Sequence, residues 1–168
     1  SMSGAYRSIG INRNDFMSLV QMRPEGGTAY GTLEWVAYAS NAFNTMVPFY
    51  ADVDETPEYL ANTTGEVSTG NFYWTSRMIA AMADASYGKS LFHVEHYQEN
   101  VLAKSHALIN QYDALLADEK DPEKQMELKR KANRKVAEMV QKEASATLKK
   151  VLYELSNQMK NSYARSDV

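Results

Sequence analysis

The sequence predicts an α+β fold in which antiparallel strands, at about residues 6–50, precede a set of helices. Two observations support this prediction. Short strand-like segments separated by turn residues dominate residues 1–70, whereas apolar residues recur at helical spacing across residues 71–168. In addition, both tryptophans and all five phenylalanines lie before residue 93. We therefore expect residues 1–168 to form one unit, with a strand-and-loop region followed by a helical region.

Three segments have the composition of strands. Residues 6–13 and 32–40 alternate between apolar and polar side chains, as strands with one buried face do. Residues 15–23 are apolar enough to indicate a strand buried on both faces. A proline and three glycines mark residues 23–31 as a turn, so we expect the strands to form an antiparallel meander.

Residues 46–50, MVPFY, form a short apolar run with a proline in its middle. Because Pro48 has no N–H to donate to a neighbouring strand, the run is predicted to be an edge strand or an extended loop. Its aromatic rings must then be covered by another element. The acidic stretch DVDETP, residues 52–57, is expected to return the chain to solvent.

Three helices are predicted, at about residues 72–87, 90–117 and 122–163. Gly88 is expected to terminate the first helix and Ser90 to cap the second. The predicted apolar stripes are Met78, Ile79, Met82 and Tyr87; Val94, Tyr97, Val101, Leu108, Tyr112 and Leu115; and Val136, Val140, Leu148, Val151, Leu155 and Met159.

The stretch DEKDPEKQ, residues 118–125, separates the last two helices. Asp121 is expected to cap the final helix and Pro122 to take its first position. Because the connection is short, the two helices are predicted to be antiparallel neighbours. A basic patch at residues 129–135 lies among glutamates, which favours a solvent-exposed amphipathic face.

The composition excludes several kinds of function. A net charge of −3 gives no electrostatic signature of nucleic-acid binding, and no basic helix suits a membrane surface. The chain has no cysteine, so it offers no disulfide, no thiolate metal ligand and no cysteine nucleophile of its own. A cytoplasmic location fits this composition.

Few residues have a pattern that indicates chemistry. His93 and His96 lie three apart on a predicted helix near two glutamates, a spacing that could hold a divalent metal. A polar helix face explains the same pattern, so we expect no metal and no cofactor. The aromatic groups at 34–40, 47–50 and 71–74 could line a ligand pocket, although packing in the core is the favoured interpretation.

Several phrases in a fixed order resemble the C-terminal part of the bacterial dipeptidase A family. They are YRSIGINR and VQMRP, then GTLEWVAYASNAFNTMVPFYADVDETPEYL, then GNFYWTSRMIAAMAD, and together they extend over about residues 6–100. The members of this family are cysteine dipeptidases of the N-terminal-nucleophile hydrolase group. They are distantly similar to penicillin V acylase and bile salt hydrolase.

The resemblance implies a parent protein with an αββα sandwich fold, which hydrolyses dipeptides through a cysteine at its mature N-terminus. Since this sequence has no cysteine, it would be a C-terminal fragment whose partner is the N-terminal part of the parent chain. The resemblance also indicates Arg7 as a residue that supports the cysteine or holds the dipeptide carboxylate, with a surface ion pair as the alternative. The isolated fragment is predicted to be inactive and to self-associate through exposed apolar surface.

Two other functions remain open from the sequence. The chain could be a non-catalytic interaction module that dimerises through the Val/Leu/Met stripe of its helical hairpin. It could also be a hydrolase that uses Ser1 as an N-terminal nucleophile, although the Ser-Met start has the form of a cloning scar. The reading frame ahead of Met2 distinguishes a peptidase fragment from an independent module.

Overall fold

A computed structural model of the chain describes residues 14–159. The predicted strand at 6–13 and the candidate residues Arg7 and Ser1 lie outside this range. The elements follow in the order β1 (Phe16–Met22), η1 (Pro24–Gly26), α1 (Gly27–Tyr30), β2 (Thr32–Tyr38), β3 (Val47–Tyr50), α2 (Glu58–Ala61), α3 (Phe72–Ala85), α4 (Tyr87–Asp118) and α5 (Pro122–Ser156). Strands therefore precede the three long helices, which confirms the predicted α+β class.

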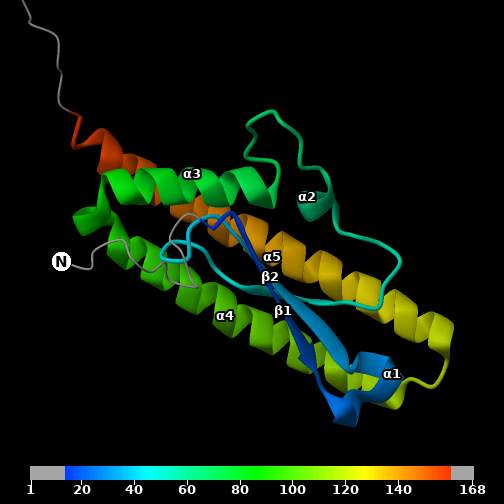
Figure 1. The fold of residues 1–168 in the computed structure, drawn as a ribbon. Coiled ribbons are helices and arrows are strands. Elements are labelled where there is room, and N and C mark those ends of the chain that lie inside the picture. Colours follow the sequence, from blue (N-terminus) through cyan, green and yellow to red (C-terminus); the bar gives the residue numbers. More distant parts are fainter. Residues whose placement is uncertain (1–13, 160–168) are drawn as a thin grey trace, which may run out of the picture.

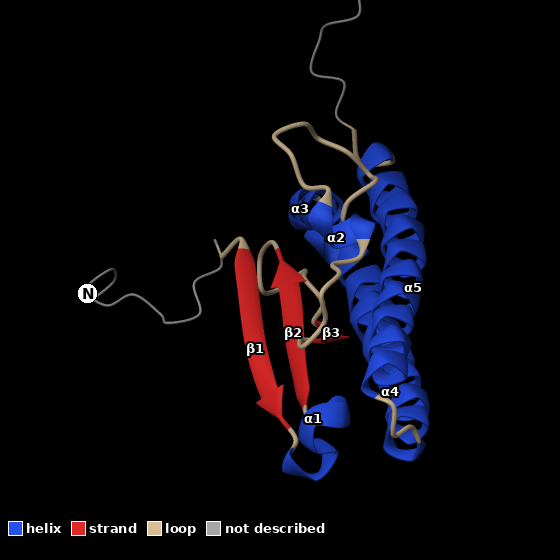
Figure 2. Ribbon diagram, turned by 90° about the vertical axis from the view of Figure 1, so that its right-hand side faces the viewer, coloured by secondary structure: helices blue, strands red, loops and turns tan. Residues whose placement is uncertain are grey.

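The strands form one antiparallel sheet in the order β1-β2-β3. Leu19 of β1 is opposite Trp35 of β2, and Leu33 of β2 is opposite Tyr50 of β3. Figure 2 shows β1 on the side of the sheet away from the helices and β3 on the side next to them. Consequently β3 packs on α4 and α5, whereas β1 pairs with β2 alone within the described residues 14–159.

The prediction that residues 15–23 are buried on both faces is wrong. The large apolar residues Phe16, Leu19, Val20 and Met22 of β1 are 53–79% exposed. β1 is an edge strand, and no element within residues 14–159 covers either of its faces. Its apolar sequence therefore marks a surface that this part of the chain leaves open.

The short strand β3 is the predicted edge strand, and its aromatic rings are covered as expected. Phe49 and Tyr50 are buried against the helices. The side-chain amide of Asn133 on α5 completes the open edge of the sheet. Its Oδ1 accepts from the Tyr50 N–H at 2.8 Å and its Nδ2 donates to the Tyr50 carbonyl at 3.0 Å. One asparagine thus replaces a neighbouring strand at this position.

The connection from β1 to β2 reverses the chain as predicted, but it does so through the two short helical turns η1 and α1. Gly31 is required where the connection ends, because a Cβ there would lie 2.2 Å from the Gly27 carbonyl oxygen. The single-turn helix α2 is a further element that the sequence pattern did not indicate.

The boundary between α3 and α4 differs from the prediction. The Asn71 side chain caps α3 by accepting from the Trp74 N–H at 2.8 Å. α3 ends at Ala85 and its C-cap is Ser86 instead of the predicted Gly88, so Gly88 and Ser90 both lie in the first turn of α4. The Ser86 hydroxyl bonds the Met82 carbonyl at 2.7 Å and lies 2.5 Å from the Ser90 hydroxyl. The backbone of Ser86, with φ −127° and ψ 35°, is no longer helical, so α3 ends before the glycine is reached.

α4 and α5 are antiparallel neighbours, as the short connection predicted, and Figure 1 shows them side by side. The Asp121 side chain accepts from the Glu123 N–H at 3.0 Å, which confirms the predicted cap, and Pro122 follows it. α5 ends at Ser156, short of the predicted residue 163, and Met159 is exposed. Of the two neighbouring leucines near the end of α4, Leu116 is buried, whereas Leu115, the one predicted to be in the apolar stripe, is half-exposed.

The main core lies between the sheet and helices α3, α4 and α5. Val136, Val140 and Val151 of α5 are fully buried in it, together with Phe72 and Ile79 of α3. The part of the α5 stripe from Val136 to Val151 is therefore occupied within the chain. A second, smaller cluster packs β2 and β3 against the C-terminal part of α4 and the N-terminal part of α5. It consists of Leu33, Tyr50, Ile109, Tyr112, Leu116 and Ala132.

The basic patch at 129–135 is not simply a solvated face. Lys129 is 4% exposed and binds Asp52 at 2.6 Å. Arg130 binds both carboxylate oxygens of Asp54, at 2.7 and 2.5 Å, and Arg134 binds Glu55 at 2.8 Å. The acidic stretch after β3 thus lies along α5, where these ion pairs hold it.

Candidate functional site

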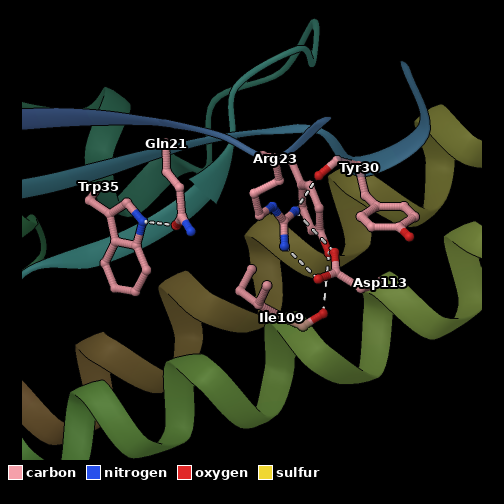
Figure 3. Close-up of polar contacts among 7 residues, drawn as sticks. Gln21, Arg23, Tyr30, Trp35, Ile109 and Asp113 are labelled. Carbon is pink, nitrogen blue, oxygen red and sulfur yellow. Dashed lines mark hydrogen bonds and ion pairs between the residues drawn. The ribbon is translucent and has the colours of Figure 1, made fainter. Parts of the chain in front are cut away.

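A cluster of polar side chains joins the end of the β1–β2 hairpin to α4 (Figure 3). Arg23 follows β1 and donates to both carboxylate oxygens of Asp113 on α4, at 2.5 and 3.1 Å. Its Nη2 also donates to the Tyr30 carbonyl, and its guanidinium lies 5.4 Å from the centre of the Tyr30 ring. Only 11% of the Arg23 side chain and 18% of the Asp113 side chain are exposed.

Tyr50 adds a third donor to the Asp113 carboxylate. Its hydroxyl donates to Oδ1 at 2.8 Å, and it lies 3.4 Å from the carbonyl oxygen of Ile109. Burial, followed by the hydrogen bond to Asp113, raises the pKa of the Tyr50 phenol well above its ordinary value. The phenol therefore stays protonated at neutral pH and holds the carboxylate without acting as a base. This cluster anchors the hairpin to the helices.

Two buried tyrosines predict a loss of stability in alkaline solution. Burial raises the pKa of Tyr97 as well as that of Tyr50. Above about pH 10 the unfolded chain releases these phenolic protons while the folded chain retains them. The unfolded state then binds fewer protons, so the free energy of unfolding falls by up to about 1.4 kcal/mol per pH unit for each tyrosine.

The variant Tyr97→Phe tests this prediction, because the Tyr97 hydroxyl finds no hydrogen-bond partner within residues 14–159. The substitution removes an ionisable group without breaking an observed bond. The free energy of unfolding, measured with urea between about pH 9 and about pH 11, should fall less steeply with pH in the variant. The difference in slope should correspond to about one proton. Identical slopes for the two proteins would contradict the assignment.

A groove of about 630 Å³ lies at the opposite end of β1, between α3 and the loop from β2 to β3. Arg77 of α3 lies in its wall and forms an ion pair with Asp15. The Tyr73 and Trp74 rings are 5.6 and 5.8 Å from the Arg77 guanidinium, and Nη1 donates to the Tyr73 hydroxyl at 3.2 Å. Stacking of this kind holds a guanidinium in one orientation.

The loop that forms the other wall is tied down by polar bonds. Ala39 has a φ of 70°, an uncommon conformation for a residue with a Cβ. Its carbonyl accepts from the Asn44 side chain at 3.1 Å, and the Gln98 side chain of α4 donates to the Asn44 carbonyl at 2.7 Å. The bonds from Asn44 and Gln98 compensate for the strained backbone and give the groove a fixed wall.

His93 and His96, whose spacing could hold a metal, do not come together. The His93 ring nitrogen lies 3.4 Å from a Glu154 oxygen, whereas His96 is half-exposed and 4.0 Å from Glu99. Within residues 14–159 no group of three or more histidine, cysteine, aspartate or glutamate side chains is arranged to hold a metal ion. None of the described helices is both long enough and apolar enough to cross a membrane.

Asp113, Arg77 and Asn133 each bond a helix to a distant part of the chain, and the sequence did not single them out. Each is an ordinary polar residue on a helix, and its partner lies far away in the chain. Arg23 was visible only as part of the phrase VQMRP, without an assigned role. The sequence could have indicated Asp113 and Asn133, because each places a polar side chain next to the buried apolar positions of its helix.

Comparison with known proteins decides the family. The sequence profile of peptidase family C69 matches residues 2–100. The chain belongs to this family.

Relatives of this C69 chain carry dipeptidase names. It is 41% identical over 164 residues to a "probable dipeptidase A" of Streptococcus pyogenes, covering 96% of this chain and 33% of the relative. It is 34% identical over 200 residues to a "dipeptidase" of Bifidobacterium longum, covering 96% of this chain and 37% of the relative. The predicted relationship to dipeptidase A is confirmed, and the chain spans about a third of the length of these relatives.

Proposed function

We propose that this chain is the C-terminal portion of a dipeptidase, whose N-terminal cysteine nucleophile is supplied by polypeptide other than these 168 residues. Three observations support the proposal. The chain belongs to peptidase family C69, its relatives are called dipeptidases, and it has no cysteine of its own. Without the attacking thiolate, the chain contributes scaffold and part of the substrate site.

The structural observation that supports the proposal best is the open strand β1. Within residues 14–159 no strand pairs with its outer edge, and its large apolar residues are exposed. Exposed apolar strands of this kind are aggregation-prone unless another chain segment covers them. We propose that the rest of the peptidase packs on β1 and extends this sheet into the αββα sandwich.

A purified-protein assay tests the proposed division of roles. The 168-residue chain should not hydrolyse dipeptides, whereas a longer polypeptide from the same reading frame that begins at a mature cysteine should. In that longer protein Cys→Ser at the nucleophile should abolish turnover. Arg7→Ala should lower it at least about tenfold if Arg7 supports the thiolate or binds the substrate carboxylate. Hydrolysis by the 168-residue chain alone would overturn the proposal.

The alternative of a module that dimerises through the stripe of α5 is not favoured. Val136, Val140 and Val151 are fully buried against the sheet and the other helices. Dimerisation through this stripe would require the chain to unpack its own core, which costs about 1.5–3 kcal/mol for each valine exposed.

A further inference from the structure

The groove beside α3 is separate from the Arg23 cluster and has features of a ligand site. We propose that it binds a short zwitterionic peptide, with Arg77 binding the carboxylate and Asp84 the ammonium group. The choice of a peptide as the ligand rests on the proposed dipeptidase function, whereas the location of the site is inferred from the groove and its charged residues. Its volume of about 630 Å³ lies within the range usual for small-molecule sites.

Arg77 is suited to bind a carboxylate. Its guanidinium is oriented by the Tyr73 and Trp74 rings and by the Tyr73 hydroxyl. Its present acidic partner, Asp15, is 62% exposed, so this ion pair is solvated and contributes little. A peptide carboxylate entering the groove can therefore replace Asp15 on the guanidinium and form a bidentate pair.

Asp84 supplies the opposite charge on the same face of the helix. It lies seven residues after Arg77, which is about two turns or about 10 Å along α3. Both residues line the groove, and Asp84 forms no ion pair with any residue of the described part of the chain. Ala80 and Ala81 lie between them, so no large side chain fills the space that separates the two charges.

The spacing of the charges fits a dipeptide. Two extended residues span about 7 Å, and a hydrogen bond at each end adds about 3 Å, which gives about 13 Å between the binding groups. The guanidinium of Arg77 leans toward Tyr73 and Trp74, away from Asp84. The rise of about 10 Å along the helix axis between Arg77 and Asp84 is of the same order as this span.

The remaining walls provide apolar contact for a peptide side chain. Phe43 from the loop and Tyr87 at the start of α4 line the groove, with their ring centres 6.1 Å apart in an edge-to-face arrangement. The loop is held in place by the bonds from Asn44 and Gln98. A fixed wall lowers the conformational cost of binding, which favours recognition of a small ligand.

Calorimetric or NMR titration of the folded 168-residue chain with the dipeptide Ala-Leu tests the proposal. Ala-Leu should bind at least about tenfold more tightly than N-acetyl-Ala-Leu, which lacks the ammonium group, and than Ala-Leu amide, which lacks the carboxylate. Arg77→Gln should abolish the difference between Ala-Leu and its amide. Asp84→Asn should abolish the difference between Ala-Leu and its acetylated form.

Three further variants make the test specific. Ala81→Phe fills the groove from an exposed helix position and should block binding while the chain stays folded, as circular dichroism would show. Asp15→Asn removes the competing carboxylate and should tighten binding. Arg134→Gln, an exposed arginine paired with Glu55, is the matched control and should leave binding unchanged.

Equal binding of the three peptides, or no binding of Ala-Leu to the folded chain, would overturn the proposal. These outcomes are distinguishable from failure of the proposed function. The titration needs only the described fold, whereas the hydrolysis assay needs the longer polypeptide with its cysteine. If the longer protein hydrolyses dipeptides but the groove does not bind Ala-Leu, the proposed binding site is wrong and the dipeptidase assignment stands.

Discussion

Replacing Asn133 with alanine should lower the free energy of unfolding by about 3 kcal/mol. The Asn133 side chain is buried and bonds both the N–H and the carbonyl of Tyr50 in β3. Alanine would leave these two backbone groups buried without partners, and each unsatisfied group costs about 1–3 kcal/mol. Urea unfolding followed by circular dichroism measures the change directly.

The matched control is Asn110→Ala on α4, where the asparagine is exposed. This substitution should change the free energy of unfolding by less than about 0.5 kcal/mol. If Asn133→Ala were as mild as this control, the closure of the β3 edge by a helix side chain would not be important for stability. Hydrogen exchange at the Tyr50 amide offers a second readout, since its protection should fall in the variant.

Asp113→Ala is expected to be at least as damaging, with a loss of about 3–5 kcal/mol. The substitution leaves the largely buried Arg23 guanidinium without its ion-pair partner and removes the acceptor of the Tyr50 hydroxyl. Breaking a buried ion pair by removing one partner costs this amount, because an uncompensated charge remains in the interior. Chemical denaturation at neutral pH is again the appropriate measurement.

A double-mutant cycle separates the ion pair from general disruption. Arg23→Met combined with Asp113→Ala should be less destabilising than the sum of the two single changes, because the double variant leaves no charge stranded. Glu99→Ala, which removes an exposed acid from the same helix, is the control and should have little effect. Strict additivity of Arg23→Met and Asp113→Ala would show that the pair does not act as a unit.

Local features of the fold were predictable from the sequence. The pattern Asp121-Pro122 predicted the start of α5, and the short break before it predicted an antiparallel helix pair. Pro48 predicted that its segment could not be a central strand. These inferences succeed because caps, proline geometry and loop length act within a few residues of the chain.

The errors occurred where a competing interaction decided the outcome. The apolar composition of residues 15–23 was interpreted as burial, yet β1 lies at an edge that the described chain leaves uncovered. Gly88 was predicted to end α3, but the non-helical backbone at Ser86 ends the helix earlier. The basic patch was assigned to solvent because its acidic partners, Asp52, Asp54 and Glu55, precede it by more than 70 residues.

By itself, the sequence determined the order of strands and helices, the first residue of α5, and the fact that the chain belongs to a dipeptidase-related family. Only the tertiary structure decided which polar groups meet. Arg23 and Asp113 are 90 residues apart in the chain, and Asn133 and Tyr50 are 83 apart. Periodicity and turn chemistry report on neighbours along the chain, whereas these contacts depend on how the sheet packs against α4 and α5, so no local pattern contains them.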